Sequence, residues 1–257
     1  AFPAGIYTIN SAAATGGTNF QSFADAIAAL NCGIAGPVVF NVVPGSGPYT
    51  EQVVIPSVIG VSAVNTITFN GNGDTLQFDA VSGARHIILL DGADHIHIKK
   101  LYIRSLDATY GWGVHLQNGA DNNVIDSCTI DMSGITSTTT DNSAGIVAAN
   151  STSNLNADGE ANNNVISNDT IIGGYQGIII NGSATALNAV GNTITNNLIR
   201  DFHANGMELT DNDGAVISFN DIHRANRPNG TTFAGIELGT GNQNMTVSGN
   251  RIHDTHT

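Results

Sequence analysis

Two glutamates in the later part of this chain are spaced so that they could do acid/base chemistry. Glu208 and Glu237 each occupy the third place of a short segment, Gly-Met-Glu-Leu at 206–209 and Gly-Ile-Glu-Leu at 235–238. If these segments are neighbouring parallel strands, the two carboxylates lie about 5 Å apart. Carboxylates that close repel, which favours the protonated form of one, and retaining glycosidases use such a pair. The alternative is two solvated glutamates on a surface strand.

A second group of reactive side chains follows a recurrent isoleucine. Arg200, His223 and His253 come directly after it, with His203, Arg224 and Asp254 close by in the sequence. Arginine could bind a sugar carboxylate, His with Asp could hold a metal, and His could carry a proton. The alternative is polar decoration of an exposed edge. We take as candidate catalytic residues Glu208, Glu237, His223, His253 and Arg200.

Aromatic side chains near the middle of the chain form a third candidate. Tyr110 and Trp112 could stack on a sugar ring near His115, although the single Trp of a chain more often serves packing. The candidate substrate-binding residues are therefore His115, Trp112, Tyr110, His203, Arg224 and Asp254.

A calcium site has only weak support. The segment 211–214 (Asp-Asn-Asp-Gly) resembles the start of a calcium loop but lacks the bidentate glutamate expected downstream. An ordinary Asn/Asp turn explains the segment better. We predict no resident metal or cofactor, and calcium is the option left open.

Internal repeats determine which elements position these residues. The pattern Val-Ile-x-x-x-Thr-Ile at 124–130 returns at 165–171, and related copies begin at 97, 193, 216 and 246. Successive copies are separated by 27, 41, 28, 23 and 30 residues, which suits single coils of a parallel β-helix with loops of variable length.

A second motif, a glycine followed by alternating residues, runs between the copies. It begins at Gly113, Gly145, Gly177, Gly206 and Gly235. Strand alternation points the middle residue outward, which gives the outward series Ile88, His115, Val147, Ile179, Glu208 and Glu237. Stacked coils also predict an internal ladder of Ile130, Ile171, Ile199, Ile222 and Ile252. A ladder of Asn197, Asn220 and Asn250 is expected at a bend.

The two ends of the chain differ in pattern. Phe20, Phe23, Ala24, Ile27 and Leu30 fall at helical spacing and predict a short capping helix. The last repeat has no such cap after it. We expect one all-β domain over 1–257, a right-handed parallel β-helix with the cap and first strand in 1–45 and coils in 46–257. It would be part of a longer protein, or self-associate end to end through the uncapped C-terminal coil.

Composition excludes several classes of partner. The net charge of −13 argues against nucleic acid and anionic membranes, and apolar runs are only strand-sized, so we expect no membrane insertion. The start, Ala-Phe-Pro, is typical of a mature end left by signal-peptide removal, which predicts a secreted or cell-surface protein. Two cysteines are too few for a disulfide scaffold.

The repeats resemble those of right-handed β-helix proteins of the pectate-lyase-like superfamily over roughly residues 85–255. The segment 5–42 looks like the start of large secreted surface proteins of Bacteroidota. Enzymes of the β-helix superfamily generally bind and act on their substrates at one exposed strand face. The segment 110–115 is similar to the Tyr-Gly-Phe-Asp-Pro-His motif of alginate C5-epimerases, but Gly and Val replace its catalytic Asp-Pro.

Function is less specified than fold, because this superfamily includes lyases, hydrolases, epimerases, esterases, tailspikes and adhesins. The sequence lacks recognisable polygalacturonase or pectate-lyase motifs. We favour an extracellular polysaccharide-recognising module, carbohydrate-binding or adhesive. A polysaccharide lyase or glycoside hydrolase is the first alternative, and a structural spacer or assembly unit is the second.

Overall fold

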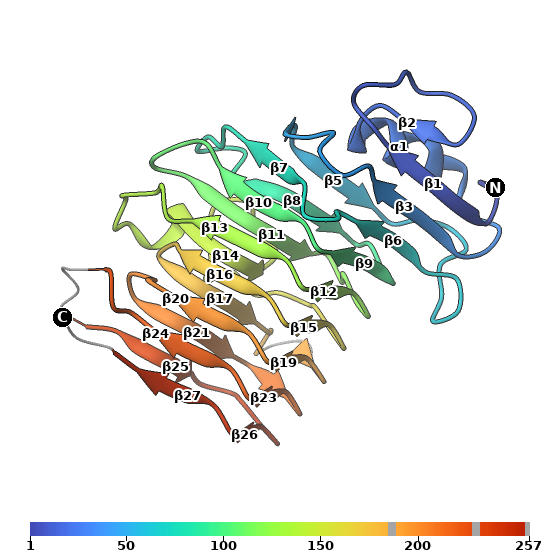
Figure 1. Cartoon of the computed structure of the whole chain (residues 1–257). Helices are drawn as coiled ribbons and strands as arrows, with labels where there is room; N and C mark the ends of the chain where they lie inside the picture. Colours follow the sequence, from blue (N-terminus) through green and yellow to red (C-terminus); the bar gives the residue numbers. More distant parts are fainter. Residues whose placement is uncertain (185–188, 228–231, 255–257) are drawn as a thin grey trace.

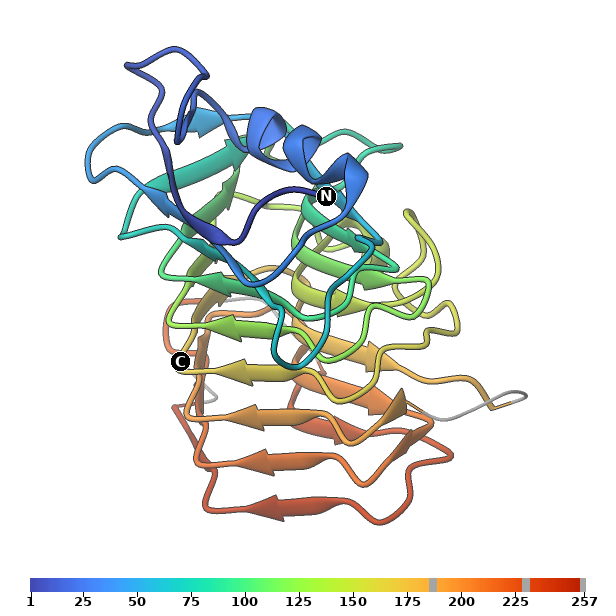
Figure 2. The same cartoon turned by 90° about the vertical axis from the view of Figure 1, so that its right-hand side faces the viewer.

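The chain winds into a parallel β-helix built from three sheets. The computed structural model describes residues 1–184, 189–227 and 232–254. Along the coils the chain passes repeatedly from the first sheet to the second and then to the third, and neighbouring coils pair in parallel (Figure 1). Figure 2 shows the coils stacked from the N-terminal strands in blue to the C-terminal strands in red. The fold predicted from the repeats is confirmed.

The strands of each sheet are short, as single coils require. The first sheet contains β1 (Gly5–Ile9), β2 (Asn19–Phe20), β3 (Val38–Val42), β6 (Ile67–Asn70), β9 (Ile96–Lys99), β12 (Val124–Asp126), β15 (Val165–Ser167), β19 (Thr193–Thr195), β23 (Val216–Ser218) and β26 (Thr246–Ser248). The second contains β4 (Tyr49–Thr50), β7 (Thr75–Phe78), β10 (Tyr102–Ser105), β13 (Thr129–Met132), β16 (Thr170–Gly173), β20 (Leu198–Arg200), β24 (Asp221–His223) and β27 (Arg251–His253). The third contains β5 (Val53–Pro56), β8 (His86–Asp91), β11 (Gly111–Gln117), β14 (Ser143–Ala148), β17 (Gln176–Asn181), β21 (Asn205–Thr210) and β25 (Ala234–Leu238). The short strands β18 (Ala189–Val190) and β22 (Asn212–Asp213) pair separately, and η2 (Thr140–Asn142) is a single 3₁₀ turn.

The register follows the sequence repeats, with one exception. Val124 pairs with His97 on one side and with Val165 on the other, and the later copies pair in the same phase. The exception is the outward series on the third sheet, where His115 pairs with Leu89 and not with Ile88. The turn after β11 is one residue longer than the turn after β8. Paired residues of β8 and β11 are therefore 26 residues apart in the sequence, whereas paired residues of β9 and β12, beyond these turns, are 27 apart.

The glycine motif exists because the second and third sheets approach closely. A Cβ placed on Gly145 would lie 2.4 Å from the Cγ2 atom of Ile171 and 2.6 Å from the carbonyl oxygen of Gly177. Gly177 faces Ile199 in the same way one coil further on. Each ladder isoleucine therefore packs against a glycine of the third sheet, and any side chain there would displace it. The glycine motif and the isoleucine repeat therefore recur together because their residues contact each other.

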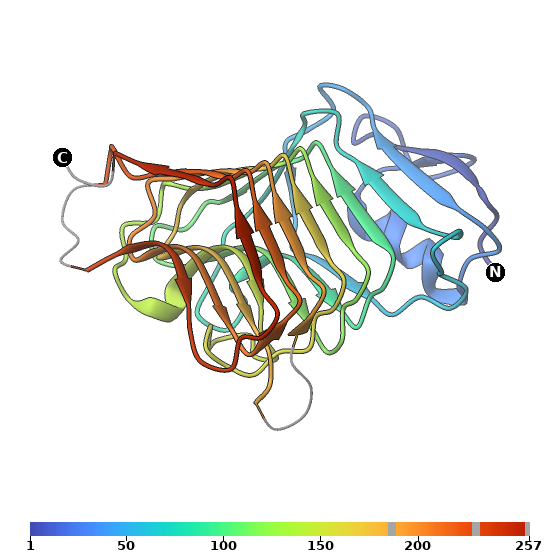
Figure 3. The same ribbon diagram turned by 90° about the horizontal axis from the view of Figure 1, so that it is seen from below.

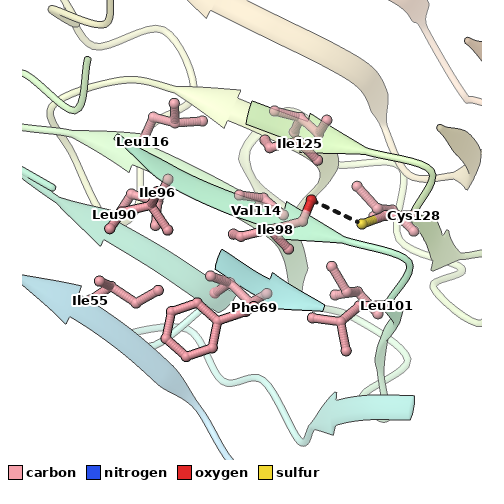
Figure 4. Packing of buried hydrophobic residues seen from close by; sticks show 14 of the residues in the cluster. Ile55, Phe69, Leu90, Ile96, Ile98, Leu101, Val114, Leu116, Ile125 and Cys128 are labelled. Atoms are coloured by element: carbon pink, nitrogen blue, oxygen red, sulfur yellow. Dashed lines mark hydrogen bonds between the residues drawn. The ribbon is translucent and has the colours of Figure 1, made fainter. Parts of the chain in front are cut away.

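Asparagine ladders hold the bends between coils. The backbone N–H of Asn197 donates to Oδ1 of Asn220, whose N–H donates to Oδ1 of Asn250. Nδ2 of Asn197 donates to the carbonyl of Ile166 in the preceding coil, at 3.0 Å. The predicted ladder is confirmed, and Asp169 and Cys128 continue it toward the N-terminus. Asp169 accepts from the Cys128 N–H at 2.7 Å, and Sγ of Cys128 reaches the Ile98 carbonyl (Figure 4).

A helix closes the N-terminal end, as expected. The helix α1 (Phe23–Ala29) begins at Ser22, whose side chain accepts from the Asp25 N–H, and continues into η1 (Leu30–Cys32). Phe23 packs against Tyr49 and Phe69 of the first coils. Phe20 lies in β2 before the helix and not within it.

The C-terminal end has its inner face open among the described residues. Ladder positions there are 44–49% exposed at Leu238, Val247 and Ile252, whereas Leu209, Ile217 and Ile222 one coil earlier are completely buried. Figure 3 shows this last coil at the opposite end of the stack from α1.

Candidate functional site

An outward ladder on the second sheet brings the predicted charged residues together. Strand pairing places in consecutive coils Gln77, Arg104, Asp131, Ile172, Arg200, His223 and His253. The sequence expectation that Arg200, His223 and His253 are neighbours on adjacent coils is thus met by the register.

A cavity of about 240 Å³ opens beside this ladder, between Asp131 and Arg200. Arg200 forms an ion pair with Asp201 at 2.8 Å, and Asp201 also accepts from the Asn226 N–H at 2.9 Å. Asp131 accepts from the Tyr102 hydroxyl at 2.5 Å and from the Ser133 N–H at 2.9 Å. Burial alone would raise the pKa of Asp131, but these hydrogen bonds and the Arg200 charge outweigh it and lower the pKa. Asp131 is therefore a stable anion.

The two ladder histidines lie at the C-terminal end of the same face. Their ring centroids are 5.0 Å apart. His253 lies between two carboxylates, with Nδ1 2.7 Å from Asp254 and Nε2 2.6 Å from Asp221. These hydrogen bonds to Asp254 and Asp221 raise the pKa of His253. Nδ1 of His223 is buried without a hydrogen-bond partner among the described residues. The arrangement can hold a proton on His253, with a second imidazole beside it.

His203 and Arg224 lie where the chain turns from the second sheet to the third. The His203 ring lies 5.2 Å from the ring of Tyr175. Burial, and then the charges of Arg227 and Arg224, lower the pKa of His203. Arg224 is buried, with Nε donating to the Phe202 carbonyl at 2.8 Å. These residues support the turn next to the cavity.

The glutamate pair lies on the third sheet, and an asparagine joins its members. Glu208 and Glu237 are register partners on β21 and β25. Nδ2 of Asn205 donates to Oε2 of Glu208 at 2.9 Å and to Oε2 of Glu237 at 2.7 Å. Nε2 of Gln176 also donates to Oε2 of Glu208, at 2.6 Å. Since one nitrogen reaches both carboxylates, these oxygens lie within the sum of the two bonds, 5.6 Å. The predicted proximity is present.

The charged ladder and the glutamate pair face outward from different sheets. Arg200 ends β20 in the second sheet, and Glu208 lies in β21 of the third, after the turn at 201–204. The chain therefore offers two faces meeting at one corner.

Trp112 and His115 do not form an open sugar platform. The loop after β14 folds back over the outer face of the third sheet, and Leu155 packs there with Trp112, Val147 and Ile179. Trp112, His115 and Leu155 are completely buried. The expectation of ligand contact at Trp112 and His115 fails for this reason, while Tyr110 remains partly exposed beside the Arg85 guanidinium.

Sequence reasoning missed several residues that complete these faces. Asn205 bridges the two glutamates and Gln176 donates to Glu208, and the position of each directly before a motif glycine, Gly206 or Gly177, was a usable signal. Arg227 and Asn226 line the cavity from a loop outside the repeat, where periodicity carries no information. Asp221 lies two residues before His223 in the sequence, but the repeat pattern did not predict its hydrogen bond with His253.

No group of three or more His, Cys, Asp or Glu side chains suited to a metal occurs among the described residues. Asn212, in the segment that resembles a calcium loop, donates instead to the Ile180 and Thr210 carbonyls. The described part of the chain holds no helix long and apolar enough to span a membrane.

Comparison with known proteins supports the architecture. A family model described as a right handed beta helix region matches residues 176–257. Curated protein sequences give no significant match.

Solved structures extend the similarity to almost the whole chain. The GH136 lacto-N-biosidase from Eubacterium ramulus aligns with a TM-score of 0.63 at 10% identity, over 96% of this chain and 56% of that one. Escherichia coli ybhc aligns with a TM-score of 0.58 at 12% identity, over 96% and 84%. An alginate lyase from Paenibacillus sp. str. FPU-7 aligns over 100% and 97% at 13% identity, with a TM-score of 0.48. At these identities the likeness shows the fold alone, and this chain spans only 56% of the lacto-N-biosidase.

Proposed function

We propose that the chain is a polysaccharide-recognising β-helix module of a secreted or cell-surface protein of the Bacteroidota type. It would bind carbohydrate through the outer faces of its later coils. The similar lacto-N-biosidase structure is a carbohydrate-active protein by name, which is compatible with this proposal.

The observation that carries the proposal is the amide-bridged glutamate pair on the third sheet. Within the described residues Glu208 and Glu237 use only Oε2 in hydrogen bonds, so each keeps Oε1 for another donor. Carboxylates held by side-chain amides are suited to accept the hydroxyl groups of a sugar. Because the pair follows the coil repeat, it offers acceptors at about 5 Å spacing along the solenoid.

Binding to insoluble polysaccharides and to a glycan array tests the proposal. The wild-type chain should be retained on at least one neutral or acidic glycan, and the double variant Glu208→Gln/Glu237→Gln should lose about tenfold or more in affinity. Glu160→Gln, an exposed glutamate outside both faces, is the matched control and should bind as the wild type does. Blank results on every glycan, or equal retention of the double variant, would contradict the proposal.

One observation favours a glycoside hydrolase as the second candidate. The two carboxylates lie within 5.6 Å of each other, and retaining glycosidases hold theirs about 5–5.5 Å apart. One glutamate would protonate the leaving oxygen while the other attacked the sugar. Release of reducing ends by the wild type but not by Glu208→Gln would favour the hydrolase, and unsaturated products would indicate a lyase instead. His223→Ala and His253→Ala test the histidine candidates in the same assay.

The open C-terminal coil supports the assembly alternative. Exposed Leu238, Val247 and Ile252 could pack against a second copy, although α1 blocks the opposite end of the solenoid. Sedimentation should then show dimers that Ile252→Lys dissociates. Monomers at high concentration would remove this alternative.

A further inference from the structure

The cavity on the second sheet is lined by two guanidiniums, and that of Arg227 forms no hydrogen bond or ion pair with a described residue. It is lined by Asp131, Ser133, Ile172, Gly173, Arg200, Asp201, Asn226 and Arg227. Both carboxylates are already satisfied, Asp201 by Arg200 and Asn226, and Asp131 by Tyr102 and Ser133. Arg227 has no hydrogen bond or ion pair with any described residue.

Arg227 is held there at an energetic cost. Its side chain is partly buried, and burial together with the nearby Arg224 lowers the pKa of its guanidinium, while Asp201 acts in the opposite sense. Arg200 adds donors, because only its Nη1 is engaged with Asp201. In a chain of net charge −13, this cavity has no negative excess, because two guanidiniums with free donors balance its two carboxylates.

The other lining groups narrow the class of anion. Ser133 and Asn226 can form hydrogen bonds with the hydroxyl groups of a sugar, and ionised Asp131 can accept hydrogen bonds from those hydroxyls. Ile172 provides an apolar surface for the sugar ring. The two lining carboxylates balance the two guanidiniums, so the cavity has no excess positive charge to favour a doubly charged phosphate over a singly charged carboxylate. The volume of about 240 Å³ lies below the usual range for drug-sized ligands and suits one sugar residue.

We propose that this cavity is a subsite for the carboxylate-bearing residue of an acidic glycan, with Arg227 and Arg200 binding the carboxylate. The subsite lies on a different sheet from the glutamate pair. Its biological meaning rests on the proposed polysaccharide recognition, but the site can be tested without a polysaccharide.

Isothermal titration with free monosaccharides provides the test. Glucuronate or galacturonate should bind the wild type, and glucose and galactose should not. Arg227→Gln should weaken uronate binding by about tenfold to a hundredfold, since it removes a charge-assisted hydrogen bond. The uronate affinity of Arg227→Lys should lie between those of the wild type and Arg227→Gln, because lysine keeps the positive charge but loses the planar guanidinium fork. The control is Arg251→Gln, an exposed arginine on β27 that does not line the cavity.

Each result supports or overturns the subsite. Arg227 has no partner among the described residues, so its variants should unfold at the wild-type temperature, and a binding loss then reports the site itself. The subsite is wrong if uronates do not bind at millimolar concentration, if Arg227→Gln binds them as well as the wild type, or if glucose 6-phosphate binds more tightly. Uronate binding that needs Arg227, without retention on any polysaccharide, would keep the subsite and overturn the proposed function.

Discussion

Replacing Asp169 by Asn should stabilise the protein at alkaline pH and leave its stability at acidic pH nearly unchanged. Asp169 occupies a rung of the asparagine ladder between Cys128 and Asn197. On the following rung Nδ2 of Asn197 donates to the Ile166 carbonyl, and the equivalent acceptor for Asp169 is Ile125, the register partner of Ile166. Oδ2 of Asp169 is buried without a partner among the described residues. A protonated carboxyl can donate there as an amide does, but a carboxylate cannot.

The size of the effect follows from the pKa. Burial raises the pKa of Asp169 from 3.8 to about 8, the Cys128 N–H opposes the rise, and the nearby Asp126 adds to it. Between these two values the folded chain holds a proton that the unfolded chain has released, so the free energy of unfolding falls as pH rises. Each pH unit is worth about 1.4 kcal/mol, which gives a loss of about 5 kcal/mol by pH 8. Asn has no proton to lose and keeps the ladder complete.

Urea unfolding of wild type and Asp169→Asn at several pH values between 4 and 9 measures this effect. The stability difference between the two proteins should be small near pH 4 and grow toward about 5 kcal/mol near pH 8. Comparing the proteins at each pH cancels the titration of every other group. The reverse change, Asn197→Asp, should introduce a similar alkaline loss on the next rung. A difference that is constant across pH would refute the assignment of a neutral Asp169.

Three further predictions concern packing and the acidic side of the stability curve. Gly177→Ala should lower the free energy of unfolding by about 1–3 kcal/mol, because its Cβ would lie 2.4–2.6 Å from the next coil's backbone and the ladder isoleucine. Gly134 has open space around it, so Gly134→Ala should lower the free energy of unfolding much less in the same urea titration. Leu155→Ala should cost about 3 kcal/mol and make Trp112 accessible to acrylamide quenching, and a Trp112 that stays protected would contradict the covering role of the loop. Burial lowers the pKa of His115 to about 4, so the unfolded chain binds the extra proton between pH 4 and 6.5 and stability rises with pH there. His115→Leu should remove about 3 kcal/mol of that rise in the pH dependence of unfolding, and an unchanged acid limb would oppose this explanation.

The repeat pattern predicted the stacking because each rung is determined by local spacing. Once Val124 was aligned with Val165, the isoleucine and asparagine ladders and the Glu208–Glu237 contact followed from strand alternation alone. The prediction that Ile88 is the outward partner of His115 was wrong because the turn after β11 is one residue longer than the turn after β8. One extra residue exchanges the inward and outward faces of the strand, and the similarity of the two turn sequences does not reveal it.

Loops outside the repeat limited the prediction of the candidate site. The burial of Trp112 depends on Leu155 folding back across the third sheet, a contact with no periodic signature. Arg227 contributes to the cavity from another such loop. Long-range loop docking depends on side-chain packing, so the sequence could place residues on a face but not say which of them a loop would cover.

The shared register makes whole coils interchangeable units of length. Val165-Ile166-Ser167 and Val216-Ile217-Ser218 are the same tripeptide, and each pairs with the intervening strand at 193–195 in identical phase. Excision of residues 193–215 would bring these tripeptides into contact and shorten the solenoid by one step of about 4.8 Å, with every ladder still continuous. Such an architecture can gain or lose coils by duplication and deletion, so the distance between its ends is open to adjustment in evolution and in design without rebuilding the core.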